Sequence, residues 1–181
     1  MPRTGGPQKI IMLPYLFLFL QLAFAFFFFY LCLAFVTGAP FVPSTDPVSK
    51  GMIRLAHIKK GQTVYDLGSG NGKLLFLAAQ KGARAKGLEI NPFLVLYANI
   101  RSFFSHYRNT VQTYWKDFWS APLSDADVVF IYLLPWRMEK LEKNLQKKLK
   151  KGTLIVSNSF IFPHLTCVEK DESLHIFAFK M

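Results

Sequence analysis

The sequence has few cysteines and no recognisable set of metal ligands. Its two cysteines, Cys32 and Cys167, lie in an apolar stretch and near the carboxyl end, so they predict neither a disulfide nor a metal site. The four histidines are scattered along the chain, and no zinc-ligand spacing occurs. A domain without disulfides is typical of the reducing cytosolic side of a membrane. The sequence therefore predicts no metal cofactor.

Charge of either sign is absent from residues 10–36, which are dominated by Phe, Leu and Ala. As one helix, this stretch would be roughly 40 Å long, against roughly 30 Å for the hydrocarbon core of a bilayer. Tilt, or a bend near Pro14, would absorb the difference. We therefore predict a transmembrane anchor over residues 10–36, preceded by a basic tail over residues 1–9.

A cleavable signal peptide is the alternative interpretation of this stretch. Arg3 and Lys9 provide a basic start, and residues 37–39 are similar to a small-residue cleavage site. The apolar run is longer than the roughly 7–15 residues of the apolar region in a signal peptide, which favours an anchor. Its orientation stays open, because Lys50 and Arg54 on one side balance Arg3 and Lys9 on the other.

Acidic residues are scarce, and all eleven lie after the apolar run. Of the 22 Lys and Arg residues only Arg3 and Lys9 precede it, so the rest of the chain carries a net charge of +9. Beside a membrane, such a domain is attracted to anionic headgroups by about 1 kcal/mol for each well-placed cation. Nucleic acid is the other partner that a basic domain suggests. The anchor favours membrane lipid and a membrane protein as partners over nucleic acid.

Residues 37–47 contain Gly38, Pro40, Pro43 and Pro47, which is typical of a short, stiff linker. One folded domain is expected over residues 48–181. Stretches typical of strands and helices then alternate along the chain, which predicts an α/β fold with a parallel sheet and helices on both faces. The expected strands are 63–67, 84–89, 110–114, 128–132, 153–158, 166–170 and 174–179, and the expected helices are 48–58, 73–81, 93–107 and 136–151.

The first expected strand leads into Gly68-Ser69-Gly70-Asn71-Gly72, a loop that opens directly into a helix. Glycines let the backbone turn tightly and let a ligand approach where a Cβ would block it. Asp66 precedes this loop. Glu89 ends the second strand, where a carboxylate can accept hydrogen bonds from ribose hydroxyls. This spacing alone leaves a nicotinamide cofactor and S-adenosylmethionine both open, and an ordinary βαβ turn is a further alternative.

The sequence of residues 66–72, Asp-Leu-Gly-Ser-Gly-Asn-Gly, resembles the first motif of the class I S-adenosylmethionine-dependent methyltransferases. The resemblance implies a Rossmann-like sheet and S-adenosyl-L-methionine as the cofactor. In that family the loop faces the amino-acid part of the cofactor, Asp66 would contribute to the same site, and Glu89 matches the ribose-binding position. Asp117 matches, more weakly, an acidic residue at the adenine amino group. A loop aspartate that caps a turn is the alternative for Asp117.

The fourth expected strand ends in Tyr132-Leu133-Leu134-Pro135-Trp136, across the cleft from the transferred methyl group. Methyltransferases that act on nucleobase or glutamine amino groups often carry Asn- or Asp-Pro-Pro-Tyr here, and this chain lacks that sequence. The Tyr132 hydroxyl could orient a lysine amine, while Trp136 could pack along the alkyl stem or against the methylated cation. These two are the candidate catalytic residues. Hydrophobic packing at a strand end is the alternative for both.

Four segments together resemble a narrower family, the small membrane-anchored protein-lysine methyltransferases that include those modifying the ATP synthase c subunit and the adenine nucleotide translocase. The segments are residues 41–44, 66–72, 89–92 and 132–136, and the resemblance covers roughly Ala39 to the end. It implies methyl transfer to a lysine of a membrane protein. The implied cofactor-binding residues are Pro43, Ser44, Asp66, Gly68, Ser69, Gly70, Gly72, Glu89, Asn91 and Asp117.

Two other functions remain open at this point: methylation of a lipid, quinone or other small molecule, and a non-catalytic S-adenosylmethionine-binding membrane module. Cofactor supply favours a single-pass protein with its domain on the cytosolic side, or the inner mitochondrial membrane in a eukaryote. Only a handful of residues separate Asn158 from Thr166, too few for the helical crossover of about a dozen residues between parallel strands. We therefore expect an abbreviated carboxyl end.

Overall fold

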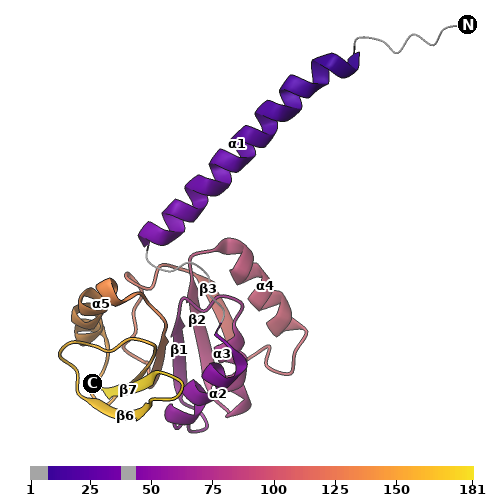
Figure 1. Cartoon of the computed structure of the whole chain (residues 1–181). Coiled ribbons are helices and arrows are strands. Elements are labelled where there is room, and N and C mark those ends of the chain that lie inside the picture. Colours follow the sequence, from indigo (N-terminus) through magenta and orange to yellow (C-terminus); the bar gives the residue numbers. More distant parts are fainter. Residues whose placement is uncertain (1–7, 38–43) are drawn as a thin grey trace, which may run out of the picture. The chain divides into compact units, whose positions relative to one another are not determined.

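The computed structural model describes residues 8–37 and 44–181, which belong to two separate units of the chain. The first unit contains the helix α1, Gln8–Thr37 (Figure 1). Side chains are described from Met12 to Phe29, and all of these are exposed. This stretch of 18 residues is long and apolar enough to cross a membrane. The predicted helix over residues 10–36 is therefore confirmed as a helix.

The second unit is built on one mixed sheet of seven strands in the order β3-β2-β1-β4-β5-β7-β6 (Figure 1). From β3 to β5 each strand is parallel to its neighbour, whereas β7 is antiparallel to both β5 and β6. The strands are β1 Thr63–Leu67, β2 Arg84–Glu89, β3 Val111–Trp115, β4 Val128–Ile131, β5 Leu154–Asn158, β6 Cys167–Asp171 and β7 Ile176–Lys180. The helices of this unit are α2 Asp46–Leu55, α3 Lys73–Gln80, α4 Pro92–Phe103 and α5 Pro135–Lys148.

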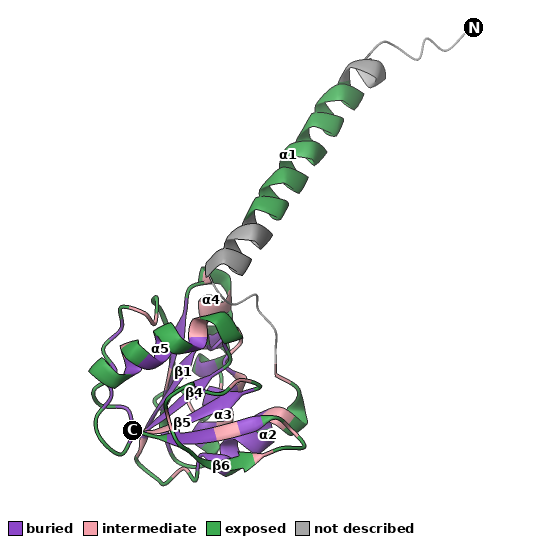
Figure 2. Ribbon diagram, turned by 60° about the vertical axis from the view of Figure 1, so that its left-hand side comes forward, coloured by how far each residue is buried: buried purple, intermediate pink, exposed green. Residues whose placement is uncertain are grey.

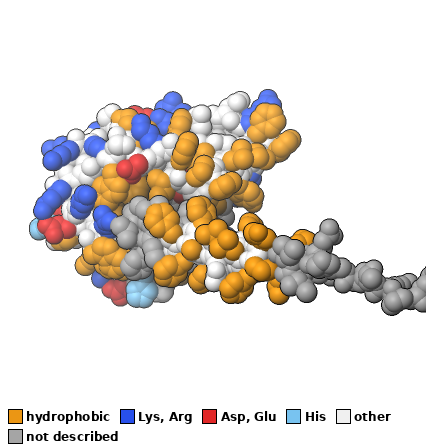
Figure 3. Space-filling model, turned by 90° about the horizontal axis from the view of Figure 1, so that it is seen from above, with side chains coloured by type: hydrophobic (Ala, Val, Ile, Leu, Met, Phe, Trp, Pro, Cys, Tyr) orange, Lys and Arg blue, Asp and Glu red, His pale blue; other side chains and the backbone are white. Residues whose placement is uncertain are grey.

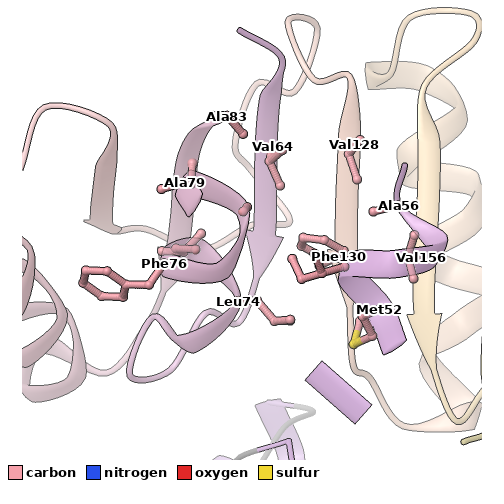
Figure 4. Packing of buried hydrophobic residues seen from close by; sticks show 14 of the residues in the cluster. Met52, Ala56, Val64, Leu74, Phe76, Ala79, Ala83, Val128, Phe130 and Val156 are labelled. Carbon is pink, nitrogen blue, oxygen red and sulfur yellow. The ribbon is translucent and has the colours of Figure 1, made fainter. Parts of the chain in front are cut away.

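One face of the sheet packs against α2 and α3. Figure 4 shows Met52 of α2 and Leu74 of α3 near Phe130 of β4, and Ala56, which follows α2, beside Val156 of β5. These five residues are buried, and together with their neighbours they form one continuous apolar cluster. Burial of so much apolar surface against the sheet supplies the main stabilisation of this layer.

The other face of the sheet packs mainly against α5. Met138, Leu141 and Leu145 recur at intervals of three and four residues, so they form one apolar stripe on the helix, and all three are buried. They belong to the cluster that contains Val129 of β4 and Ile155 of β5. Both faces of the central strands are therefore covered, and these strands are largely buried in Figure 2. The prediction of helices on both faces is confirmed.

The carboxyl end departs from a regular βαβ pattern. Residues 159–166, between β5 and β6, contain no helix, as the short spacing predicted, and β7 inserts between the two strands. The predicted parallel sheet holds for β1 to β5 and is wrong for β7. All four helices end earlier than expected: α3 by one residue, at Gln80, and the other three because the chain turns out of the helical conformation at His57 (φ +43°), after Phe103, and at Leu149 (ψ 143°).

Candidate cofactor site

The strand order reverses between β1 and β4. From β1 the chain moves outward through β2 to β3, then returns to β4 on the other side of β1. Leu67 pairs with Ile131 at the carboxyl ends of these two strands, so the loops that follow leave the sheet side by side. Ligands of open parallel sheets bind at such a switch point. The glycine loop after β1 and the segment that begins at Tyr132 therefore border the candidate site.

The loop after β1 depends on glycines in the left-handed region. Gly68, Gly70 and Gly72 have φ values of +85°, +53° and +78°, which side chains with a Cβ rarely adopt. A Cβ placed on Gly68 would meet no atom within 4 Å, so the backbone borders open space there. Gly72 is the N-cap of α3. The loop thus exposes bare backbone to the switch point before the helix begins.

The backbone N–H groups at the start of this loop are already engaged within the protein. Gly68 and Ser69 donate to the carbonyl oxygen of Leu88 at 2.8 and 3.2 Å. The Gly70 N–H donates to Oε2 of Glu89 at 2.9 Å. A loop that binds a pyrophosphate directs such N–H groups at the phosphates. The occupied N–H groups and the carboxylate beside them therefore argue against a dinucleotide, which the spacing of the sequence left open.

The Glu89 carboxylate is held in a fixed orientation at the end of β2. Its Oε2 accepts from Gly70, its Oε1 accepts from the Asn91 N–H at 2.9 Å, and the side chain is buried. A carboxylate offers about four lone-pair positions, so each oxygen retains capacity for another donor. This geometry suits acceptance of two hydroxyl groups, as the ribose-binding interpretation of Glu89 requires.

The Asp66 side chain is buried in β1 at the same edge of the sheet. Burial, and then the neighbouring charge of Glu89, raise the pKa of its carboxyl to about 7. Among the residues that the structure describes, no ion pair includes Asp66. A buried pair of carboxylates without a cation is unfavourable. A positively charged ligand would relieve this repulsion, and an anionic one would increase it.

Gly87 is a residue of the site that the sequence analysis missed. It lies in β2, opposite Asp66, and a Cβ there would come within 2.4 Å of the Ser69 hydroxyl and 2.7 Å of Leu75 Cδ1. The Ser69 hydroxyl is therefore packed toward β2, where it is buried and forms no hydrogen bond with the described residues. Ser69, predicted to bind cofactor, can take part through its backbone. A glycine inside a strand often marks the close approach of another segment, and this feature of the sequence could have identified Gly87.

The segment before α2 is tied to the start of α3. The ammonium group of Lys73 donates to the carbonyl oxygen of Ser44 at 2.8 Å and forms an ion pair with Asp46. A hydrogen bond from Lys73 to the Asp46 carboxylate, and then the positive charge of Lys73, lower the pKa of the Asp46 carboxyl. Lys73 directly follows Gly72, so Ser44 is held next to the glycine loop, as its predicted role requires. Pro43, the other predicted residue of this segment, lies outside the described residues.

Two further predicted residues cap local structure. The Asn91 side chain is the N-cap of α4 and accepts from the Phe93 N–H at 3.0 Å. The Asp117 side chain accepts from the Trp119 N–H at 3.0 Å, which is the turn-capping arrangement weighed as its alternative. Asp117 is exposed, and its second carboxylate oxygen is compatible with a contact to adenine. That contact stays a prediction for Asp117.

The two candidate catalytic residues lie on the β4 side of the switch point. Tyr132 directly follows β4 and is 37% exposed, while Trp136 lies in the first turn of α5 and is 59% exposed. Buried Leu133 anchors the segment between them, and Pro135 begins the helix. The core therefore does not enclose the two aromatic rings, so both have surface available for an acceptor side chain. Their catalytic role remains a prediction.

A Rossmann-like sheet with a glycine loop and a buried acidic residue at the end of the second strand defines a class of enzymes that bind adenosine-containing cofactors. The family model described as "ANTKMT methyltransferase domain" matches residues 66–169, more than half of the chain. The chain belongs to this methyltransferase family. The match begins at Asp66 and includes the glycine loop, Glu89 and Tyr132.

Curated relatives agree with this assignment. The chain is 34% identical over 127 residues to the human lysine N-methyltransferase of the ATP synthase c subunit, an alignment that covers 70% of this chain and 54% of the human protein. It is 33% identical over 132 residues to a protein-lysine N-methyltransferase of Saccharolobus islandicus, covering 71% of this chain and 81% of that protein. The chain spans about half the length of the human relative.

Solved structures show the same fold. An RNA methyltransferase from Salinibacter ruber, in complex with S-adenosyl-L-homocysteine, is 33% identical and superposes with a TM-score of 0.72 over 76% of this chain and 91% of that one. A methyltransferase from Thiobacillus denitrificans, at 20% identity and a TM-score of 0.57 over 65% of this chain and 49% of its own, shares the fold alone.

Proposed function

We propose that the chain is a membrane-anchored methyltransferase that transfers a methyl group from S-adenosyl-L-methionine to a lysine side chain of a membrane protein. The observation that carries the cofactor assignment is the pair of buried carboxylates, Asp66 and Glu89, beside a glycine loop whose N–H groups are occupied. Membership of the family and the names of the relatives at 33–34% identity support the reaction and the acceptor.

The carboxylates fit the charge and the hydroxyl groups of this cofactor. S-adenosyl-L-methionine supplies an activated methyl group, whose bond to sulfur breaks as the acceptor nitrogen bonds to the carbon. Glu89 accepts hydrogen bonds from the two ribose hydroxyls of the cofactor. Asp66 stabilises the positive charge of the cofactor's amino-acid part. The bare backbone at Gly68 allows close approach. Asp117 and Ser44 complete the adenine and amino-acid ends of the site.

The segment after β4 positions the acceptor. A lysine amine has an ordinary pKa of about 10.4 and must be neutral to attack, so a partly apolar environment that disfavours its ammonium form accelerates the reaction. Tyr132 and Trp136 provide such surroundings, with one hydroxyl to orient the nitrogen and one ring to pack along the alkyl stem. Catalysis then arises mainly from bringing the amine into line with the methyl carbon.

The helix α1 supports the proposed location. Its stretch Met12–Phe29 has the length and composition of a single membrane span. A tether of this kind confines the enzyme to the surface on which a membrane protein presents its lysine. The cytosolic side, or the corresponding side of the inner mitochondrial membrane in a eukaryote, supplies the cofactor.

Methylation of RNA is the second candidate. The Salinibacter ruber relative is described as an RNA methyltransferase, and the net charge of +9 beyond the apolar run suits a polyanion. Against this candidate, the segment after β4 reads Tyr-Leu-Leu-Pro-Trp and lacks the Asn- or Asp-Pro-Pro-Tyr sequence associated with nucleobase amino groups. The apolar helix also favours an acceptor at a membrane.

The test is to incubate the full chain in native membranes with cofactor labelled in its methyl group, and to separate protein, RNA and lipid. The proposal expects label in a protein that yields methyl-lysine on hydrolysis. Label in RNA or in extracted lipid would contradict it. Glu89→Ala is expected to abolish labelling, whereas the control Glu169→Ala on β6, at the opposite edge of the sheet, is expected to leave it unchanged.

A further inference from the structure

The helix α4 has an unusual exposed surface. Six large apolar side chains on or directly after this helix are each half or more exposed. They recur at intervals of three and four residues, so they share one side of the helix. We call this surface the α4 face, and its members are Phe93, Leu96, Tyr97, Ile100, Phe103 and Phe104.

The opposite side of α4 is held on the sheet by small and polar residues. Ala98 and Ser102 are the buried residues of the helix, and the Ser102 hydroxyl donates to the Val111 carbonyl at 2.7 Å. The Asn99 amide both donates to the Thr113 carbonyl, at 2.8 Å, and accepts from its N–H, at 2.9 Å. The helix is thus firmly placed with its large apolar residues turned outward. This is the reverse of the usual orientation of a surface helix.

The apolar surface continues onto the edge of the sheet. Trp115 ends β3, the edge strand next to α4, and is 71% exposed, while its indole N–H donates to the Ile90 carbonyl at 2.9 Å. Ile90 precedes α4 and is about half exposed. A contiguous exposed surface of this extent and composition marks a docking surface for another molecule.

The charged residues of the segment that carries this surface are all basic. Residues 90–116 contain Arg101, Arg108 and Lys116 and no acidic residue. A cavity of about 640 Å³ at the end of α4 is lined by Phe103, Phe104, Ser105, His106, Arg108 and Asn109, which combines aromatic rings with basic groups. Figure 3 shows hydrophobic side chains at the surface of the domain, together with Lys and Arg side chains and some Asp and Glu side chains. The combination of aromatic rings with basic groups complements an anionic headgroup above acyl chains.

We propose that the α4 face lies on the surface of an anionic lipid bilayer, as a second membrane contact in addition to the anchor α1. Exposed Phe, Tyr and Trp beside Arg and Lys are typical of segments that lie in the headgroup region. The same chain carries a helix long enough to span a bilayer, which would keep lipid at high local concentration. This inference rests on the membrane location in the proposed function.

Docking of this face has a consequence for the site. The helix α4 begins at Pro92, directly after Glu89 and Asn91, and its 12 residues span about 18 Å. Contact of the helix with lipid would hold the carboxyl edge of β2 within that distance of the headgroups. An acceptor lysine near the membrane surface could then reach the site, while one far above the surface could not.

The test measures how deeply α4 enters the lipid. The full chain, with Cys32→Ser and Cys167→Ser, is labelled with an environment-sensitive fluorophore through Leu96→Cys or, as the control, through Lys147→Cys on α5. It is reconstituted in phosphatidylcholine vesicles with or without phosphatidylglycerol, containing lipids that carry a nitroxide quencher near the top of the acyl chain. We expect quenching of the Leu96 label, strongest with phosphatidylglycerol, and none of the Lys147 label.

A matched pair of variants separates the α4 face from general hydrophobicity. Phe103→Ser with Phe104→Ser is expected to reduce quenching of the Leu96 label at least by half. Ile161→Ser with Val168→Ser, which removes exposed apolar residues elsewhere, is expected to leave quenching unchanged. Equal effects of the two pairs would overturn the proposal.

Other occupants of the α4 face give different results, and each overturns the lipid proposal. A second copy of the chain would shift the emission of the label in detergent as protein concentration rises. A protein partner would shift it only when that protein is added. Titration of S-adenosyl-L-homocysteine into the same sample tests the proposed function separately. If the chain does not bind S-adenosyl-L-homocysteine, the proposed function is contradicted. The quenching of the Leu96 label, which tests the lipid contact, does not depend on that result.

Discussion

At the scale of single residues, Glu89 has two tasks. Its carboxylate orients the Gly70 and Asn91 N–H groups and is proposed to accept the ribose hydroxyls. Glu89→Ala leaves the buried Gly70 N–H and the partly buried Asn91 N–H without this partner, which we expect to cost about 1–3 kcal/mol of stability. Glu89→Gln retains one carbonyl acceptor, so it should fold with a smaller loss and raise the KM for cofactor about tenfold. Thermal unfolding and steady-state kinetics measure the two effects, and an unchanged KM would contradict the ribose role.

The raised pKa of Asp66 predicts a pH dependence. Its carboxyl titrates near pH 7 when folded and near 3.9 when unfolded, so between these values the folded state binds more protons. Stability of the cofactor-free protein should therefore fall as pH rises from about 4 to about 7 through this group. Asp66→Asn should flatten that part of the profile and be more stable at pH 8. Denaturant unfolding at several pH values tests this, and an unchanged slope in the variant would refute it.

The packing at Gly87 predicts a specific double-mutant result. Gly87→Ala should destabilise the protein by about 1–3 kcal/mol, because its Cβ overlaps the Ser69 side chain and Leu75. Ser69→Gly removes one of these neighbours, so the double variant should recover part of the loss. The free energy of unfolding of all four proteins gives the coupling, and strict additivity would show that the two residues do not interact.

At the scale of elements, the sequence predicted the existence and order of the helices and strands well. Short segments that contain β-branched or aromatic residues mark β1, β4 and β5, and proline at positions 47, 92 and 135 marks three helix starts. The insertion of β7 between β5 and β6 was not predictable from local pattern, because pairing with β5 is a long-range choice. The role of Gly87 was hidden for the same reason, since it depends on Ser69 in another segment.

The short connection between β5 and β6 depends on one buried acid. Glu142 of α5 accepts from the His164 N–H at 3.2 Å and from the Gln146 amide at 3.3 Å, and the residue is 1% exposed. Because residues 159–166 lack a helix, this contact anchors them. Glu142→Ala should destabilise the protein by about 2–4 kcal/mol, partly through the cavity that it leaves. Hydrogen exchange should increase first in residues 159–166, and uniform exchange would contradict the anchoring role.

At the scale of the whole molecule, the chain joins an apolar helix to a basic domain. The sequence predicted both parts, because a charge-free run and a glycine loop are local signals. The α4 face was not predictable, since an apolar stripe on a helix is usually buried and only the packing of Ala98, Asn99 and Ser102 shows which side faces the sheet. The position of the candidate site at the carboxyl ends of β1, β2 and β4 was predictable, because its residues lie at or just after the ends of successive strands.

The proposed anchor predicts how the chain is released from membranes. Washing with high salt or with alkaline carbonate should leave the full chain in the membrane fraction, because about 20 apolar residues suffice to span the bilayer. Phe19→Asp with Leu20→Asp should release it, since charge at mid-membrane is costly. Release of the unaltered chain by salt alone would show that it is bound only at the surface.

The roles proposed for Asp66, Glu89 and the glycine loop all depend on the identity of the cofactor. Equilibrium titration of the detergent-solubilised full chain with S-adenosyl-L-homocysteine and with NAD⁺ tests it directly. We predict saturable binding of S-adenosyl-L-homocysteine, weakened about tenfold by Glu89→Gln through the loss of a charge-assisted hydrogen bond, and no binding of NAD⁺. Binding of NAD⁺, or binding of S-adenosyl-L-homocysteine that is indifferent to Glu89, would contradict this prediction.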